Sequence, residues 1–113
     1  MATATFRHQG AAIDFTPGTD VAAGDVIVRG ELVGVARLDI KAGRLGALAV
    51  EGVFDVPKAT GAGSALAAGA DVHWDAGAQQ ATADAASGAN KRLGRVVQDA
   101  TDDDAIVRVR LSQ

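Results

Sequence analysis

The chain has 113 residues, a mass of 11.4 kDa and a formal charge of −3 at pH 7, which predicts a single domain spanning residues 1–113. The absence of cysteine excludes disulfides, thiolate metal sites and cysteine nucleophiles, and the weak acidity is untypical of proteins that coat nucleic acid. No apolar run approaches the roughly 20 residues of a membrane span. Residues 1–7 lack the apolar core of a signal peptide, so we expect synthesis in a cytoplasm.

The composition favours strands over helices. Valine, which suits a pleated sheet, outnumbers isoleucine and leucine combined, and aspartate, which suits turns, greatly outnumbers glutamate. Fourteen glycines are spread along the chain. We therefore predict a mostly β fold, a small single-domain barrel or sandwich of about seven to nine short strands with one or two short helical turns. Alternating strands do not distinguish a barrel from a sandwich.

The first half of the chain shows several alternating segments. Short strands are expected at residues 2–8, 12–15, 25–29 and 32–40. The last two flank Gly30-Glu31, and a two-residue loop that begins with glycine favours a type II′ hairpin turn. A longer strand is predicted over Ala47–Val56, and Pro57 ends it because proline has no N–H to donate to the ladder. Its expected inward-facing residues are Leu48, Val50, Phe54 and Val56.

The second half contains the clearest strand, Ala105–Leu111, in which two arginines alternate with apolar residues. In a helix these arginines would lie about 200° apart, so the period of two indicates a strand. Asp71–Asp75 alternates in the same way, with Val72 and Trp74 on the inner face. Further strands are expected at residues 80–82 and 92–99. Helical turns are expected at 63–69, capped by Ser64, and at 83–90, where a loop is the alternative.

A short pattern occurs twice in the chain. Ala22-Ala-Gly-Asp-Val26 resembles Ala68-Gly-Ala-Asp-Val72, and each precedes an expected strand. A glycine-bearing segment then follows each of them, Leu32–Asp39 and Leu93–Asp99. The pattern indicates a turn that enters a strand and a second strand that crosses back. In an alanine-rich chain a chance match explains the similarity as well.

Two acidic clusters were considered as metal sites. His73 lies between Asp71 and Asp75, and on a strand these three side chains share one face, as a divalent metal would need. No second histidine is near in sequence, so the solvated face of a half-buried strand is the favoured interpretation. Asp102–Asp104 lacks the glycine and closing glutamate of a calcium loop. We expect a charged turn before a strand there.

Phosphate binding and nucleophilic catalysis find no support either. Lys58 precedes the glycines of Lys58–Ser64, whereas a phosphate-binding loop has its lysine after the last glycine. Ser64, Ser87 and Ser112 lie in no nucleophile elbow. We therefore predict no enzyme activity, no catalytic residue and no cofactor. A modest basic patch without interleaved aromatics is expected from Lys91, Arg92, Arg95, Arg108 and Arg110. Trp74 and Phe54 are expected in the core.

The order of several segments resembles a small bacteriophage and prophage family. The most specific part is Glu51-Gly-Val-Phe-Asp-Val-Pro-Lys58, followed by Ala70-Asp-Val-His-Trp-Asp75, and the resemblance covers nearly the whole chain. Members often carry the label of a predicted RecA/RadA family phage recombinase, and the family is also interpreted as capsid decoration, or cement, proteins. An ATPase of the RecA type needs a phosphate loop and a larger domain. The missing loop therefore favours the cement interpretation. Tyrosine is common in the family at the position of His73, which weakens a ligand role there.

The resemblance implies a homotrimer that binds the major capsid protein at threefold sites on the outer surface of the assembled head. It also implies a location in the virion after synthesis in the host bacterial cytoplasm, with no nucleic-acid or membrane partner. By analogy with other phage cement proteins, residues 2–9 are expected to be a capsid-contacting arm that adds a strand to a capsid-protein edge. The candidate contacts are Thr3, Thr5, Phe6 and Arg7. An ordinary first strand of the protein's own sheet is the alternative for this segment.

The alternative function is a DNA-associated recombination accessory protein without ATPase activity. It rests on the family label and on the C-terminal arginines. Tight, salt-sensitive binding in a DNA mobility shift would support it, because phosphate contacts make affinity depend on salt.

Overall fold

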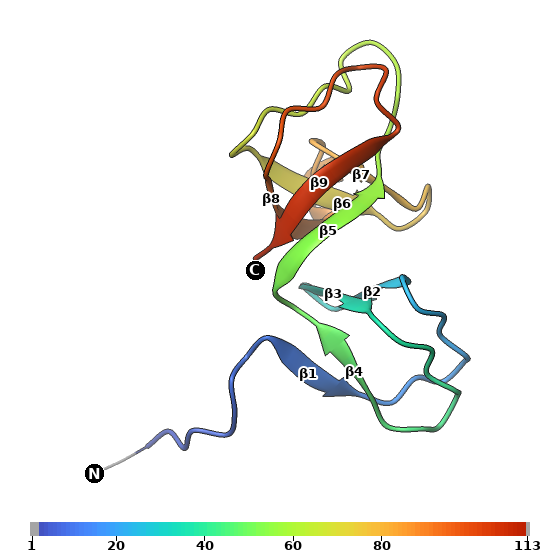
Figure 1. Cartoon of the computed structure of the whole chain (residues 1–113), viewed down its shortest axis with the longest axis vertical. Coiled ribbons are helices and arrows are strands. Elements are labelled where there is room, and N and C mark those ends of the chain that lie inside the picture. The colour runs from blue at the N-terminus through green and yellow to red at the C-terminus, as the bar shows by residue number, and fades with distance from the viewer. Residues whose placement is uncertain (1–2, 113) are drawn as a thin grey trace.

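Two antiparallel β-sheets build the protein, and the computed structural model describes residues 3–112 (Figure 1). The described part contains nine strands and one short 3-10 helix: β1 (Ala12–Phe15), β2 (Val26–Arg29), β3 (Leu32–Ala36), β4 (Gly46–Ala49), β5 (Gly52–Pro57), β6 (Asp71–Asp75), β7 (Gln80–Thr82), η1 (Ala86–Gly88), β8 (Lys91–Val96) and β9 (Ile106–Leu111). The N-terminal sheet has the strand order β1-β4-β3-β2, and the C-terminal sheet has the order β5-β9-β8-β6-β7. No helix among residues 3–112 is long and apolar enough to span a membrane.

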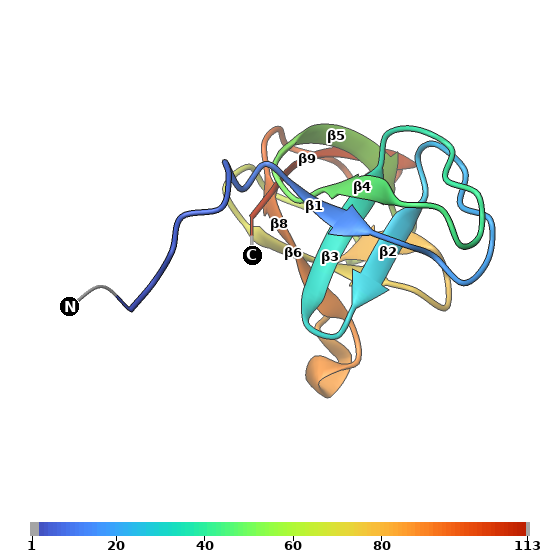
Figure 2. The same cartoon turned by 90° about the horizontal axis from the view of Figure 1, so that it is seen from below.

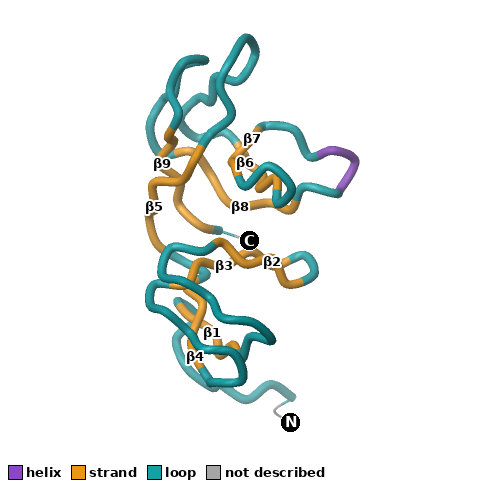
Figure 3. The backbone as a smooth tube through the Cα atoms, turned by 90° about the vertical axis from the view of Figure 1, so that its right-hand side faces the viewer, coloured by secondary structure: helices purple, strands orange, loops and turns teal. Residues whose placement is uncertain are grey.

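The two sheets share one hydrophobic core. Val33 and Val35 of β3 belong to the same buried cluster as Trp74, Leu93 and Val109 of the C-terminal sheet. Alternation along the strands explains this arrangement, because every second side chain of a strand points to the same face. The sheets do not close into a barrel, so the mostly β prediction is confirmed in its sandwich form (Figure 3).

The opposite face of the N-terminal sheet carries a second, smaller core. Val21, Ala36, Ile40 and Leu48 are buried there. Partly buried residues that pack against them are Ile13, Phe15 and Ile27. The second core lies under the long loops that connect β1 to β2 and β3 to β4. The N-terminal sheet is therefore apolar on both faces, although it has only four strands.

The two sheets repeat one hydrogen-bonded unit. The N–H of Gly24 donates to the Ala36 carbonyl at 2.6 Å, and the N–H of Gly69 donates to the Val96 carbonyl at 2.7 Å. Two isolated antiparallel bridges complete the match, Val21 with Ile40 and Leu66 with Ala100. In both units an aspartate side chain accepts a hydrogen bond from the turn, at 2.8 Å each: Asp39 from the N–H of Ala23, and Asp99 from the N–H of Ala68.

The strand order confirms that the sequence pattern marks a structural repeat. β1-β4-β3-β2 and β5-β9-β8-β6 follow the same path, and β7 with η1 is an addition to the second unit. The structural match pairs Gly24 with Gly69, one residue away from the alignment of Asp25 with Asp71 that the sequence suggested. The hydrogen-bonded turn therefore determines which residues of the two units correspond, and the sequence similarity around the turn is offset from this correspondence by one residue.

A glycine occupies the same place in β3 and β8, two residues before the residue whose carbonyl accepts the hydrogen bond from the turn. A Cβ added to Gly34 would lie 3.0 Å from the Leu48 Cβ, and one added to Gly94 would overlap the Arg110 carbonyl. Gly34 therefore lets β4 approach β3 closely, and Gly94 lets β9 approach β8 closely. The repeat therefore favours glycine at both positions, and more strictly at Gly94 than at Gly34.

Most of the predicted strands are confirmed. β1, β6 and β7 have the predicted bounds, and β9 begins one residue later than expected. The hairpin of β2 and β3 turns at Gly30, whose φ is +61° while Glu31 stays out of the positive region, as a type II′ turn requires. The 3-10 helix η1 lies in the segment 83–90, where a helical turn was one of the alternatives (Figure 3).

Three local predictions are wrong. Ala47–Val56 is two strands in different sheets, because the chain crosses at residues 50–51 and bends at Gly52, whose φ is +124°. Residues 63–69 form no helix. The Ser64 hydroxyl donates to the carbonyl of Gly61 at 2.5 Å, and Leu66 pairs with Ala100. Residues 3–8 are not a strand, and Ala2 lies outside the described residues.

Candidate functional site

The histidine face of β6 does not form a metal site. His73 is half-buried, and its Nδ1 is buried without a hydrogen-bond partner within the described chain. The flanking carboxylates are used elsewhere, since Asp71 pairs with two arginines and Asp75 accepts from the N–H of Ala78 at 3.0 Å. No group of three possible metal ligands occurs among residues 3–112.

Lys58 has a structural role in the glycine-rich segment. Its side chain is buried, 4% exposed, and its ammonium donates to the carbonyl oxygens of Ala59 at 2.7 Å and Asp104 at 3.2 Å. The Ser64 hydroxyl lies 3.4 Å away. The ammonium therefore ties the loop after β5 to the turn before β9, 46 residues later. It is satisfied inside the fold and does not point to an open phosphate cradle.

The acidic run before β9 folds as the charged turn that its sequence predicted. Asp102 accepts from the N–H of Ala65 at 2.8 Å, and Asp104 accepts from the N–H of Thr101 at 2.8 Å. Two of the three carboxylates therefore hold backbone groups of the turn and of the neighbouring loop. The arrangement serves the fold.

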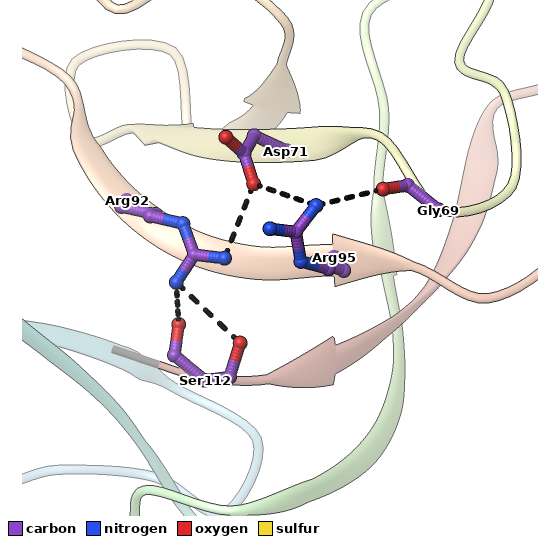
Figure 4. Close-up of polar contacts among 5 residues, drawn as sticks. All are labelled: Gly69, Asp71, Arg92, Arg95 and Ser112. Atoms are coloured by element: carbon purple, nitrogen blue, oxygen red, sulfur yellow. Dashed lines mark hydrogen bonds and ion pairs between the residues drawn. The ribbon is translucent and has the colours of Figure 1, made fainter.

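The C-terminal arginines lie on the outward side of the C-terminal sheet, and several are neutralised by aspartates. Asp71 accepts from Arg92 at 3.1 Å and lies 3.3 Å from Arg95, as Figure 4 shows. Arg92 also donates to the carbonyl of Ser112, and Arg95 to the carbonyl of Gly69 at 3.0 Å. The cluster joins β6, β8 and the end of β9.

These contacts shift the ionisation of two carboxyl groups. The hydrogen bond from Arg92 and the charge of Arg95 lower the pKa of Asp71. Arg108 donates a bidentate pair of hydrogen bonds to the Asp55 carboxylate, at 2.9 and 3.3 Å. These hydrogen bonds lower the pKa of Asp55 and raise the pKa of Arg108. Both aspartates are therefore ionised at neutral pH and neutralise part of the arginine charge.

One arginine on this side remains unpaired. Arg110 forms no ion pair within residues 3–112, and it lies directly opposite Arg95 in the ladder of β8 and β9. Exposed aliphatic side chains surround the two arginines, with Val53 opposite Arg110 on β5. We call this surface the arginine face, which consists of Val53, Asp55, Arg95, Val97, Ile106, Arg108 and Arg110.

A large hollow lies on the N-terminal sheet. It measures about 760 Å³ and runs between β1, β4 and the loop at residues 37–45. Small residues form one side and two leucines the other. Leu38 and Leu45 are 77% and 71% exposed. We call it the alanine groove, lined by Ala11, Ala12, Leu38, Leu45, Ala47 and Ala49.

The groove exists because the C-terminal sheet covers only part of the N-terminal sheet. Ala49 lies opposite Val35 and Ala12, so these three residues share one face of the sheet. Val35 belongs to the core between the sheets, whereas Ala12 is exposed. The face is therefore packed beneath β2 and β3 and open along β1 and the neighbouring part of β4.

Residues 3–9 form an extended arm that leads away from the sheets to the side of β1 (Figure 2). Every residue from 3 to 10 is exposed, and the Phe6 side chain is 78% exposed. The arm therefore holds the four predicted contact residues, Thr3, Thr5, Phe6 and Arg7, in one free segment. Its base is fixed where the Val50 N–H donates to the Ala11 carbonyl at 3.0 Å.

Sequence reasoning missed the alanine groove and the arrangement of the arginine face. The outward positions of the alternating strands were the available signal, because Val53 and Ile106 are large apolar residues on sides that the alternation leaves to solvent. The groove has no such local signal. Its lining comes from two stretches of the chain, residues 11–12 and 37–51, which only strand pairing brings together.

One comparison with known proteins gives a match. A family model described as phage cement protein matches residues 7–111. No curated protein and no solved structure matches the chain. The family match spans both sheets and includes Arg7 of the arm.

Proposed function

Because the chain belongs to the phage cement protein family, we propose that it binds the major capsid protein on the outer surface of the assembled head as a homotrimer at threefold sites. The family supports a capsid decoration role, and protein–protein binding is the action that such a role requires. In this proposal the whole chain acts as one decoration domain. It is made in the host bacterial cytoplasm and then joins the virion.

The free N-terminal arm is the observation that carries the proposal. An exposed aromatic side chain such as Phe6 is costly to leave in water, since burying a phenylalanine contributes about 1.5–3 kcal/mol. In the proposed mode, the backbone of residues 3–7 pairs with an edge strand of the capsid protein. Thr3 and Thr5 then lie on one side of the added strand, and Phe6 enters an apolar pocket on the other.

Many weak contacts account for the effect on the shell. Each copy contributes a modest contact area, but three linked arms bind three neighbouring capsid subunits at once. Linked sites raise the effective local concentration, so avidity exceeds the affinity of one arm. Such a trimer resists separation of the capsid subunits that it spans.

The test uses heads of the encoding phage prepared without this protein. Wild-type protein is added back, and co-sedimentation with the heads measures binding. A variant lacking residues 2–9 should lose binding, and Phe6→Ala should weaken the binding of each arm by about 10- to 100-fold. Thr60→Ala, which changes an exposed loop residue away from the arm, should bind as wild type does. Undiminished binding of the truncated protein would refute the role of the arm, and failure of the wild-type protein to bind would refute the function.

A further inference from the structure

Two surfaces of the chain are uncovered, and they differ in shape and in free charge. The arginine face is the outward side of a sheet, and the alanine groove is a hollow of about 760 Å³. Among residues 3–112, six large apolar side chains are exposed: five lie on these two surfaces, and the sixth is Phe6 of the arm. Contiguous exposed apolar surface of this kind marks protein contacts.

The arginine face lacks a free carboxylate, because its one carboxylate, Asp55, is paired with Arg108. Arg95 and Arg110 are direct cross-strand neighbours, and like charges in that position are destabilising. Asp71 reaches Arg95 from one side, while Arg110 has no ion-pair partner within residues 3–112. All cations of this face are arginines, the cationic residue that is enriched at protein interfaces, whereas lysine is depleted there. A partner that brings a carboxylate between apolar contacts would relieve the repulsion.

The alanine groove offers carboxylates of this kind. Glu51 lines the groove, and Asp14 lies on the same face of β1 as Ala12. Neither carboxylate forms an ion pair in the part of the chain that the structure describes. Arg37 and Arg44 also line the groove and form no ion pair in the described part of the chain. The free carboxylates of the alanine groove therefore match the free charge of Arg110 on the arginine face.

The symmetry of a trimer requires two different surfaces. In a threefold ring each subunit offers one patch to the next subunit and another patch to the previous one. A twofold contact would place the arginine face against itself, which would bring Arg110 against a second set of arginines. The charges therefore favour a head-to-tail contact over a twofold one.

We propose that the arginine face of one copy packs against the alanine groove of the next copy, and that three such contacts close the ring. The occupant of the groove is a second copy of this chain, with Val53 and Ile106 against its alanine floor and Arg110 near Glu51 or Asp14. This inference rests on the homotrimer of the proposed function, and it leaves the arms free to bind the head.

Cross-linking between two single-cysteine variants tests the interface, because the natural chain has no cysteine. Val53→Cys and Ala47→Cys both change exposed residues. The two variants, one of them carrying a size tag, are co-expressed and treated with a short bismaleimide, both in solution and bound to heads. A cross-linked product that joins the tagged and untagged chains should form, and each variant alone should give none.

A matched pair of charge reversals gives an independent measurement. Arg110→Glu should weaken trimer association at least tenfold in sedimentation, while Arg7→Glu on the arm should leave it unchanged. The unfolding midpoint of Arg110→Glu should stay near that of wild type, since the side chain is exposed.

The outcomes separate the interface from the function. Absence of the mixed cross-link in protein that binds heads, or cross-linking of Val53→Cys alone, would overturn the interface and leave head binding standing. A trimer that Arg110→Glu does not weaken would overturn it too. Wild-type protein that does not bind heads would instead overturn the proposed function.

Discussion

Replacement of Gly94 by alanine should damage the fold more than any other single methyl addition at a described glycine. The new Cβ would overlap the Arg110 carbonyl oxygen and lie 2.9 Å from the Ser112 nitrogen. Both obstacles are backbone atoms, one in β9 and one in the residue directly after it, and backbone atoms cannot rotate away as a side chain can. β8 and β9 must therefore separate at the Gly94–Leu111 pair, in the middle of the C-terminal sheet.

The expected cost follows from the two consequences of that separation. Overpacking a well-packed site costs about 1–3 kcal/mol, and a weakened ladder hydrogen bond adds about 0.5–1.5 kcal/mol. We expect Gly94→Ala to lower the free energy of unfolding by about 2–4 kcal/mol. Gly34→Ala, whose Cβ would meet Leu48 and Ala49 at 3.0 and 3.2 Å, should cost about 1 kcal/mol.

Urea unfolding followed by tryptophan fluorescence measures these changes. Trp74 is the only tryptophan and is 2% exposed, so its emission reports the loss of the core. The midpoint for Gly94→Ala should fall by about 1–3 M. Gly18→Ala is the control, because nothing lies within 4 Å of its added Cβ. If the two variants unfold within about 0.5 kcal/mol of each other at equal protein concentration, the steric argument is wrong.

Two further substitutions test polar contacts in the same urea assay. Lys58→Met keeps the apolar stem but leaves the carbonyls of Ala59 and Asp104 without their donor, and it should lower the free energy of unfolding by about 1–3 kcal/mol. Lys41→Met is the control, because it removes only an exposed ion pair with Asp20 and should lower that free energy by under about 0.5 kcal/mol. Equal effects of the two substitutions would contradict a structural role for Lys58. Asp71 has a lowered pKa in the folded state, so its ion pairs stabilise the protein above the unfolded value near 3.8 and are lost as the pH falls through the folded value. Asp71→Asn should therefore be less stable than wild type at pH 7 and lose less stability on acidification below about pH 4; parallel losses in the two proteins would show that this carboxylate does not contribute.

The alternation of apolar residues predicted the strands whose two faces differ in polarity. β6 and β9 have buried residues at every second position, and their bounds follow from the sequence to within one residue. The hairpin at Gly30 follows as well, because the turn depends on local dihedral angles alone. These features need no knowledge of the partner strand.

The errors occur where a distant partner decides the local conformation. Val50 and Phe54 continue one alternation through Ala47–Val56, although the chain passes from one sheet to the other between them. The segment 63–69 has the composition of a helical turn, but the Ser64 hydroxyl donates to the Asp102 carbonyl and Leu66 pairs with Ala100. In both places a contact from far along the chain outweighs local propensity.

The sequence by itself determined the β class, the exclusion of thiolate and phosphate-loop chemistry, and the resemblance to phage cement proteins, because each depends on residue types and short spacings. Only the tertiary structure decided the division into two sheets, the use of Lys58 as a tie to Asp104, and the positions of the arginine face and the alanine groove. The period of two tells which side of a strand is buried, but not which strand lies beside it. Strand pairing brings Arg95 opposite Arg110 and leaves the alanines of β1 and β4 uncovered, and these two surfaces carry the proposed assembly.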